Sequence, residues 1–165
     1  MFHLRLLQIG RLNFQKEETV AKIGVSSYSL TRLRKTGEFS IPFAVDWIAD
    51  NGGEHIETLD MPELDKSPAG LEALRCHAAR RGIEISGYIF GADFLHDDPA
   101  QTRAEIEAVK KQIDIAHALG APFVRHDCAR RRPPNTSTEQ FEKDLPVLIA
   151  ACRELADYAA QYGIV

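Results

Sequence analysis

The stretch KQIDIAHALGAPFVR, residues 111–125, joins the end of a helix-like pattern to a short apolar run through one glycine, Gly120. A glycine just past a helix end adopts the left-handed conformation without a Cβ penalty. The segment before it repeats apolar residues at helical spacing: Ile106, Val109, Ile113 and Ala116. This stretch therefore predicts a helix over about 100–119, a tight turn, and a strand over 122–127.

The same order recurs along the chain, with glycines at 52–53, 82 and 163. Apolar runs predict further strands at 22–28, 54–59 and 83–89, and residues 163–165 begin a fifth. Ser40 with Pro42 in the first turn, Ser67-Pro68 and Ser137-Thr138 indicate helix starts near 40, 67 and 137. The last helix is expected to restart near Pro146. Strands alternating with helices over short connections predict right-handed crossovers and a parallel sheet.

Two architectures have this order, an open doubly wound sheet and a (β/α)₈ barrel. No glycine-rich phosphate fingerprint follows the first strand, which favours the barrel. A whole barrel takes about 250 residues. The 165 residues of this chain therefore predict a truncated parallel α/β barrel of four units plus the start of strand 5, with open edges at strands 1 and 4. We place it at residues 22–165, after an N-terminal extension at 1–21.

The bulk properties exclude several classes of protein. A net charge of −4 and a pI near 5.9 offer no general attraction to nucleic acid or to an anionic membrane. No apolar run approaches the roughly 18 residues of a membrane span. The three cysteines are widely spaced and predict reduced thiols in a cytoplasmic protein.

Several segments, in order, resemble the sugar phosphate isomerase/epimerase family of xylose isomerase-like barrels. They are IGVSSYS (23–29), ADNGGEHIE (49–57), RGIEISGY (81–88), KQIDIAHALGAPFVR (111–125) and LADYAAQYGIV (155–165). The resemblance implies proton transfer beside the carbonyl of a small sugar or sugar-like substrate. It also implies a divalent cation (Mn, Mg, Co or Zn) on a Glu, an Asp, a His and a second Glu from strand 5 onward.

Those four positions follow Val165, so this chain is expected to hold no metal ligand and no catalytic residue, and to be inactive alone. Whether it is an enzyme stays open. Two alternatives remain: a metal-dependent DNA repair enzyme like the AP endonucleases of the same superfamily, and a non-catalytic half-barrel. In the second case a homodimer would cover the open barrel edges.

Barrel enzymes bind substrate at the C-terminal ends of their strands. That rule selects Tyr28 and Asp127 as rim residues, and Glu57, Tyr88, Arg125 and His126 as the predicted substrate-binding residues. Each has a plainer interpretation.

Glu57 could be a half-buried carboxylate paired with a neighbouring strand, and Tyr88 could pack at the rim. Arg125 suits an ion pair between strands, and His126 could instead bind a metal. The run Arg130-Arg131-Arg132 could hold a sugar phosphate or be solvated.

Overall fold

The computed structural model describes residues 21–37, 39–130 and 137–165. Its elements are β1 (Gly24–Ser26), η1 (Ser27–Thr36), α1 (Ile41–Asp50), β2 (His55–Leu59), α2 (Pro68–Arg80), β3 (Glu84–Phe90), α3 (Pro99–Leu119), β4 (Val124–His126) and α4 (Thr138–Ala160). The predicted order of strands and helices is confirmed. The predicted extension at 1–21 lies, except for its last residue, outside the described residues.

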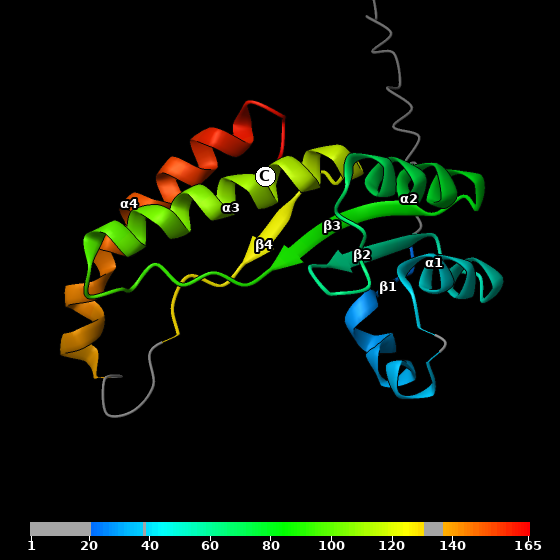
Figure 1. Ribbon diagram of the computed structural model, residues 1–165, viewed down its shortest axis with the longest axis horizontal. Helices are drawn as coiled ribbons and strands as arrows, with labels where there is room; N and C mark the ends of the chain where they lie inside the picture. Colours follow the sequence, from blue (N-terminus) through cyan, green and yellow to red (C-terminus); the bar gives the residue numbers. More distant parts are fainter. Residues whose placement is uncertain (1–20, 38, 131–136) are drawn as a thin grey trace, which may run out of the picture.

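The four strands form one parallel sheet in the order β1-β2-β3-β4. Their arrows run in the same general direction in Figure 1, with α2, α3 and α4 along one side of the sheet. The strands thus pair in the order of the sequence, and the helices that follow β2, β3 and β4 share one side, as in a barrel rather than a doubly wound sheet.

Helix ends follow the signals predicted from the sequence. The side chains of Ser40, Ser67 and Ser137 each accept a hydrogen bond from the first turn of α1, α2 and α4. Gly120 ends α3 with φ 73°, in the left-handed region. The apolar stripe of α3 is buried as predicted.

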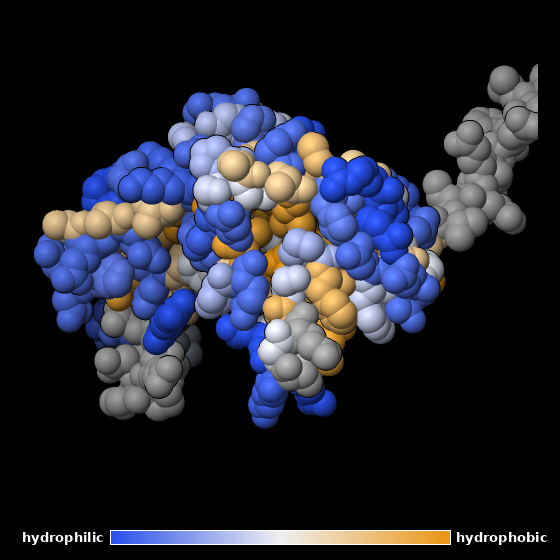
Figure 2. Space-filling model, turned by 45° about the vertical axis from the view of Figure 1, so that its right-hand side comes forward, coloured by the Kyte–Doolittle hydropathy of each residue, from blue (hydrophilic) through white to orange (hydrophobic). Residues whose placement is uncertain are grey.

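The core lies between the sheet and the helices. Ile56, Tyr88 and Phe90 contribute to it from the strands, and Ala44, Leu74 and Ile113 contribute from the helices. The molecule nevertheless exposes apolar side chains, which Figure 2 shows in the middle of one face with hydrophilic residues around them.

Strand 1 is shorter than predicted and is followed by a 3-10 helix that the sequence did not indicate. Ser27, which is fully buried, turns the chain there, and its Oγ accepts a hydrogen bond from the Leu59 backbone N–H at 3.0 Å. This bond draws the start of η1 across the end of β2, so the chain cannot continue as a strand through residue 28.

The predicted interruption of the last helix is wrong, because α4 runs through Pro146 without a break. Proline removes the hydrogen bond to the carbonyl four residues earlier, at Glu142. Both Pro146 and Glu142 are exposed, so water can reach the freed carbonyl.

The sheet has open edges at β1 and β4 in the described part of the chain. Val165 begins to pair with β4: its N–H donates to the Pro122 carbonyl at 3.1 Å, and its carbonyl accepts from the Val124 N–H at 2.8 Å. A fifth strand therefore starts beside β4, as predicted. None of the described helices is both long and apolar enough to cross a membrane.

Candidate functional site

The side of the sheet that faces away from the helices is the candidate site, and we call it the inner face. Side chains alternate between the two sides of a strand. Tyr88 contacts α3, and Ile56 and Phe90 lie in the core shared with the helices. The strand residues that alternate with these three therefore point to the inner face. Its members include Ser26, Glu57, Leu59, Gly87, Ile89, Phe123 and Arg125.

Glu57 lies at the centre of this face. The register places it beside Ser26 on β1 and Gly87 on β3, two small neighbours. It is half-buried, and its carboxylate makes no hydrogen bond or ion pair with any residue in the described ranges. The paired carboxylate considered from the sequence is therefore not found there, and both carboxylate oxygens are available to a ligand.

The inner face also carries an aromatic ring, that of Phe123. A Cβ on Gly87 would collide with the ring of Phe123, so the ring covers the glycine that neighbours Glu57. Phe123 is 38% exposed. Phe123 was not among the residues predicted from the sequence, although its alternation with Arg125 around Val124 places both on one side of the sheet.

Arg125 also lies on the inner face, in register with Ile89 of β3. Its Nη1 is 3.8 Å from Asp127 Oδ1, and both side chains are more than half exposed. The sequence suggested an ion pair between Arg125 and a neighbouring strand. The structure shows instead a loose contact between Arg125 and Asp127, two residues further along the same segment. Such an exposed pair is weak and leaves the guanidinium able to bind an anion.

Tyr88 faces the helices and is completely buried. Its hydroxyl donates to Gln112 Oε1 at 2.7 Å, and Gln112 Nε2 donates to Asp60 Oδ2 at 3.2 Å. Burial, and secondarily the charge of Asp60, raise the pKa of Tyr88 well above its usual range. The hydroxyl is therefore protonated and engaged behind the sheet, and the substrate role predicted for it remains a prediction.

His126 ends β4 on the helix side of the sheet. Its ring stacks on Phe90 with 5.6 Å between centroids and meets Phe94 edge-on at 5.7 Å. Nδ1 lies 2.7 Å from the Asp127 carbonyl oxygen. A carbonyl can only accept, so Nδ1 carries the proton and Nε2 of the neutral ring is an acceptor.

Tyr28 lies on η1 and is 67% exposed. The structure brings Glu57 and Arg125 to one face, places Tyr88 and His126 on the other, and leaves Tyr28 in solvent.

The described residues do not fit a metal site. No three of their His, Cys, Asp and Glu side chains come together in a way that could hold an ion. The implied divalent cation therefore has no ligand set in residues 21–37, 39–130 and 137–165.

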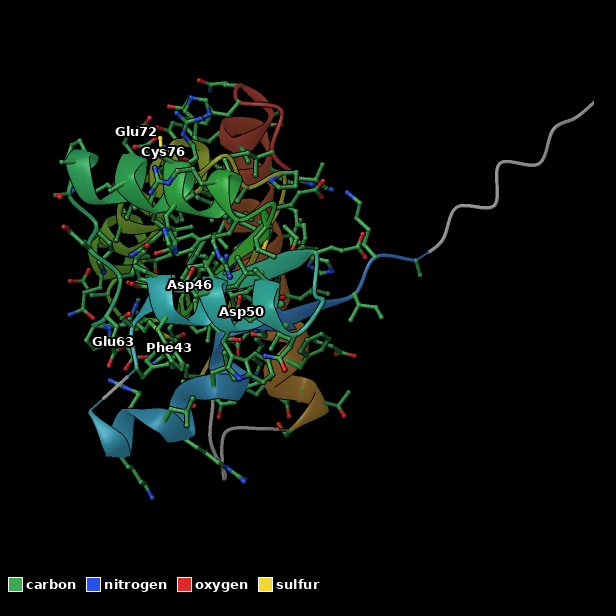
Figure 3. All side chains as sticks on the ribbon, turned by 90° about the vertical axis from the view of Figure 1, so that its right-hand side faces the viewer. Phe43, Asp46, Asp50, Glu63, Glu72 and Cys76 are labelled. Atoms are coloured by element: carbon green, nitrogen blue, oxygen red, sulfur yellow. The ribbon has the colours of Figure 1, made fainter. Side chains whose placement is uncertain are left out.

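Four acidic or thiol side chains labelled in Figure 3 belong to the outer helices rather than to the inner face. Figure 3 shows Asp46 and Asp50 on α1, and Glu72 with Cys76 on α2. Asp46 pairs with Arg81 Nε at 2.9 Å, and Asp50 also contacts Arg81. These pairs hold α1 to the end of α2.

Comparison with known proteins agrees with this geometry. Residues 45–165 match the model of the xylose isomerase-like TIM barrel family, and the chain belongs to that family. No curated protein sequence matches the chain.

Solved structures extend the similarity to almost the whole chain. A D-psicose 3-epimerase from Clostridium cellulolyticum H10, solved with D-tagatose, is 15% identical with a TM-score of 0.71 over 87% of this chain and 50% of its own. A D-allulose 3-epimerase from Methylomonas sp. is 26% identical with a TM-score of 0.62 over 87% of this chain and 49% of its own. The IOLI protein with a binding zinc atom is 17% identical with a TM-score of 0.67 over 87% of this chain and 49% of its own.

The chain thus spans about half the length of the structures it matches. A parallel sheet of four strands covering half of a TIM barrel is the fold predicted from the sequence.

Proposed function

We propose that this chain forms the first half of the barrel of a sugar isomerase or epimerase, and that Glu57 binds a substrate hydroxyl on the inner face. The observation that carries the proposal is the half-buried Glu57 carboxylate, which has no partner among the described residues and neighbours Gly87, the glycine that the Phe123 ring covers. Membership of the xylose isomerase-like family and the similarity to sugar epimerases support it.

The chemistry of the inner face suits a small sugar. A carboxylate accepts hydrogen bonds from hydroxyl groups, and these charge-assisted bonds are stronger than neutral ones. The apolar C–H face of a sugar packs on an aromatic ring, which Phe123 supplies. Arg125 donates to a carbonyl or hydroxyl oxygen at the neighbouring position.

The other two predicted residues contribute differently in this proposal. His126 offers Nε2 at the end of β4, because its Nδ1 proton is directed to the Asp127 carbonyl. Tyr88 supports the sheet from behind, since its hydroxyl already donates to Gln112.

A divalent cation would polarise the substrate carbonyl and lower the barrier to proton transfer at the adjacent carbon. Because the described residues form no group that could hold the ion, we expect no turnover by these 165 residues on their own.

The proposal is tested by measuring isomerase and epimerase turnover with the polypeptide that the gene encodes. Ketohexoses such as D-fructose, D-tagatose and D-psicose would be incubated with it and Mn²⁺, Co²⁺ or Mg²⁺, and the products separated by chromatography. Interconversion of at least one pair is expected. Failure on every ketose and aldose tested, with metal present and the protein folded, would refute it.

We further propose that a second copy of the chain covers the open edges when the 165 residues are made alone. Phe141, Leu145 and Ile149 form an exposed apolar stripe on α4, with 56%, 37% and 40% exposure. Their spacing of four residues places them on one side of the helix. Light scattering after size exclusion should give twice the mass of 18.4 kDa; a folded monomer would exclude this pairing.

A further inference from the structure

We propose that the substrate carries an anionic group, a phosphate or a carboxylate, and that Arg130 and Arg125 bind this group where β3 and β4 end. The inference rests on the proposed function, because it assigns a second contact to the same inner face.

Arg130 lies over a glycine at the end of β3. A Cβ on Gly91 would be only 2.5 Å from Arg130 Nη2, so the guanidinium occupies the space that any other residue would fill. The segments that carry the two residues are joined, because the Phe94 N–H donates to the Cys128 carbonyl at 3.0 Å. The Arg130 guanidinium thus lies against Gly91 at the end of β3, while the residue as a whole stays exposed to solvent.

The register puts Arg125 on the same side. Arg125 is opposite Ile89, and Gly91 is two residues further along the chain from Ile89. Positions two apart on a strand point the same way and are separated by roughly 6.6 Å. Arg125 therefore leaves β4 beside one inward position of β3, and the Arg130 guanidinium covers the next one, so a single anion with several oxygens could reach both side chains.

Glu57 lies deeper on the same face, in register with Gly87, two residues before Ile89. Along the inner face, from the middle of the sheet to its C-terminal end, the charged residues follow in the order Glu57, Arg125, Arg130. A linear polyol with hydroxyls toward Glu57 and an anionic end toward the arginines matches this order of charges.

The arginines are available for such a ligand. Arg130 has no hydrogen bond or ion pair with the residues that the structure describes, and Arg125 has only its loose contact with Asp127. A nearby carboxylate, Asp93, is engaged in its own loop, where its Oδ1 accepts from the Leu95 N–H at 3.1 Å. Bidentate donors such as arginine suit phosphate and carboxylate oxygens.

The test compares ligands that differ in one group. D-fructose, D-fructose 6-phosphate and D-gluconate would be titrated into the polypeptide as its gene encodes it, by calorimetry at fixed ionic strength. We expect the anionic ligands to bind at least about tenfold more tightly than D-fructose, since each charge-assisted hydrogen bond contributes about one such factor. If D-fructose 6-phosphate binds more tightly than D-gluconate, the anionic group is a phosphate; the reverse order indicates a carboxylate.

Three variants make the test specific to this geometry. Arg130→Gln should remove most of the preference for the anion. Gly91→Ala should reduce it while keeping the charge, because the new Cβ displaces the guanidinium; Gly91 has no positive φ, so alanine fits its backbone. Arg153→Gln, an exposed arginine of α4, is the control and should leave the preference unchanged.

Equal binding of D-fructose and both anions, or a preference that survives Arg130→Gln, overturns the inference. Turnover of neutral sugars alone would then leave the proposed function standing. Conversely, an anion preference that Arg130→Gln abolishes, in a protein without isomerase or epimerase turnover, supports the anion site and refutes the proposed function.

Discussion

Replacing Tyr88 by phenylalanine tests whether the Tyr88 hydroxyl belongs to the packed helix side of the sheet and not to the inner face. The hydroxyl of Tyr88 is fully buried and donates to Gln112 Oε1 at 2.7 Å. Its removal deletes one buried hydrogen bond, worth about 1 kcal/mol net. Gln112 is only half-buried, so water can satisfy the freed oxygen and keep the cost near that value.

We therefore expect Tyr88→Phe to lower the free energy of unfolding by about 1 kcal/mol, or the melting temperature by about 3 °C. Sugar affinity should not change, because the hydroxyl is on the helix side of the sheet. The measurement is denaturation followed by circular dichroism, with sugar binding by calorimetry on the same samples.

Tyr28→Phe is the matched control, since Tyr28 is 67% exposed and should lose nothing measurable. Two results would refute the reasoning. One is a stability loss for Tyr88→Phe no larger than for Tyr28→Phe. The other is a severalfold loss of sugar affinity without loss of stability, which would put the hydroxyl in the binding site.

Two further predictions concern charge and packing. Hydrogen bonds from Arg103, then from Lys110, lower the pKa of Glu154 to about 2, so its stabilising effect is present above the ordinary value of 4.5 and is lost as pH falls through about 2. Urea midpoints measured from pH 6 to pH 2 should thus fall less in Glu154→Gln than in the parent, and equal falls would contradict this. Gly87→Val should cost about 1–3 kcal/mol, because its side chain collides with the Phe123 ring. Adding Phe123→Ala should recover part of that loss in thermal melts, and additive losses would show that the two residues do not touch.

The fold was predictable because local signals and periodicity agree at each unit. Serine caps start α1, α2 and α4, glycine ends α3, and the apolar stripe of α3 is buried as its spacing predicts. The 3-10 helix η1 was not predictable, because it depends on a hydrogen bond between Ser27 and the backbone of Leu59, which is distant in sequence.

The site was predictable only in part. The strand-end rule correctly brings Glu57 and Arg125 to the sheet, but it does not say which side of a strand each residue faces. An irregularity between Ile56 and Glu57 shifts the pairing of β2 with β3, and periodicity alone cannot show such a shift. For the same reason Tyr88 was expected at the rim. Phe123 was overlooked because it directly precedes β4, and the strand-end rule selects residues at the C-terminal end of a strand.

The affinity of a ketohexose for the Glu57→Gln variant tests the central claim most directly. Glu84→Gln is the control, because Glu84 is an exposed carboxylate at the opposite end of the same sheet, paired with Lys22. The proposal predicts at least about tenfold weaker binding for Glu57→Gln and no change for Glu84→Gln. Equal affinities in the parent and in Glu57→Gln, with both proteins folded, would contradict it.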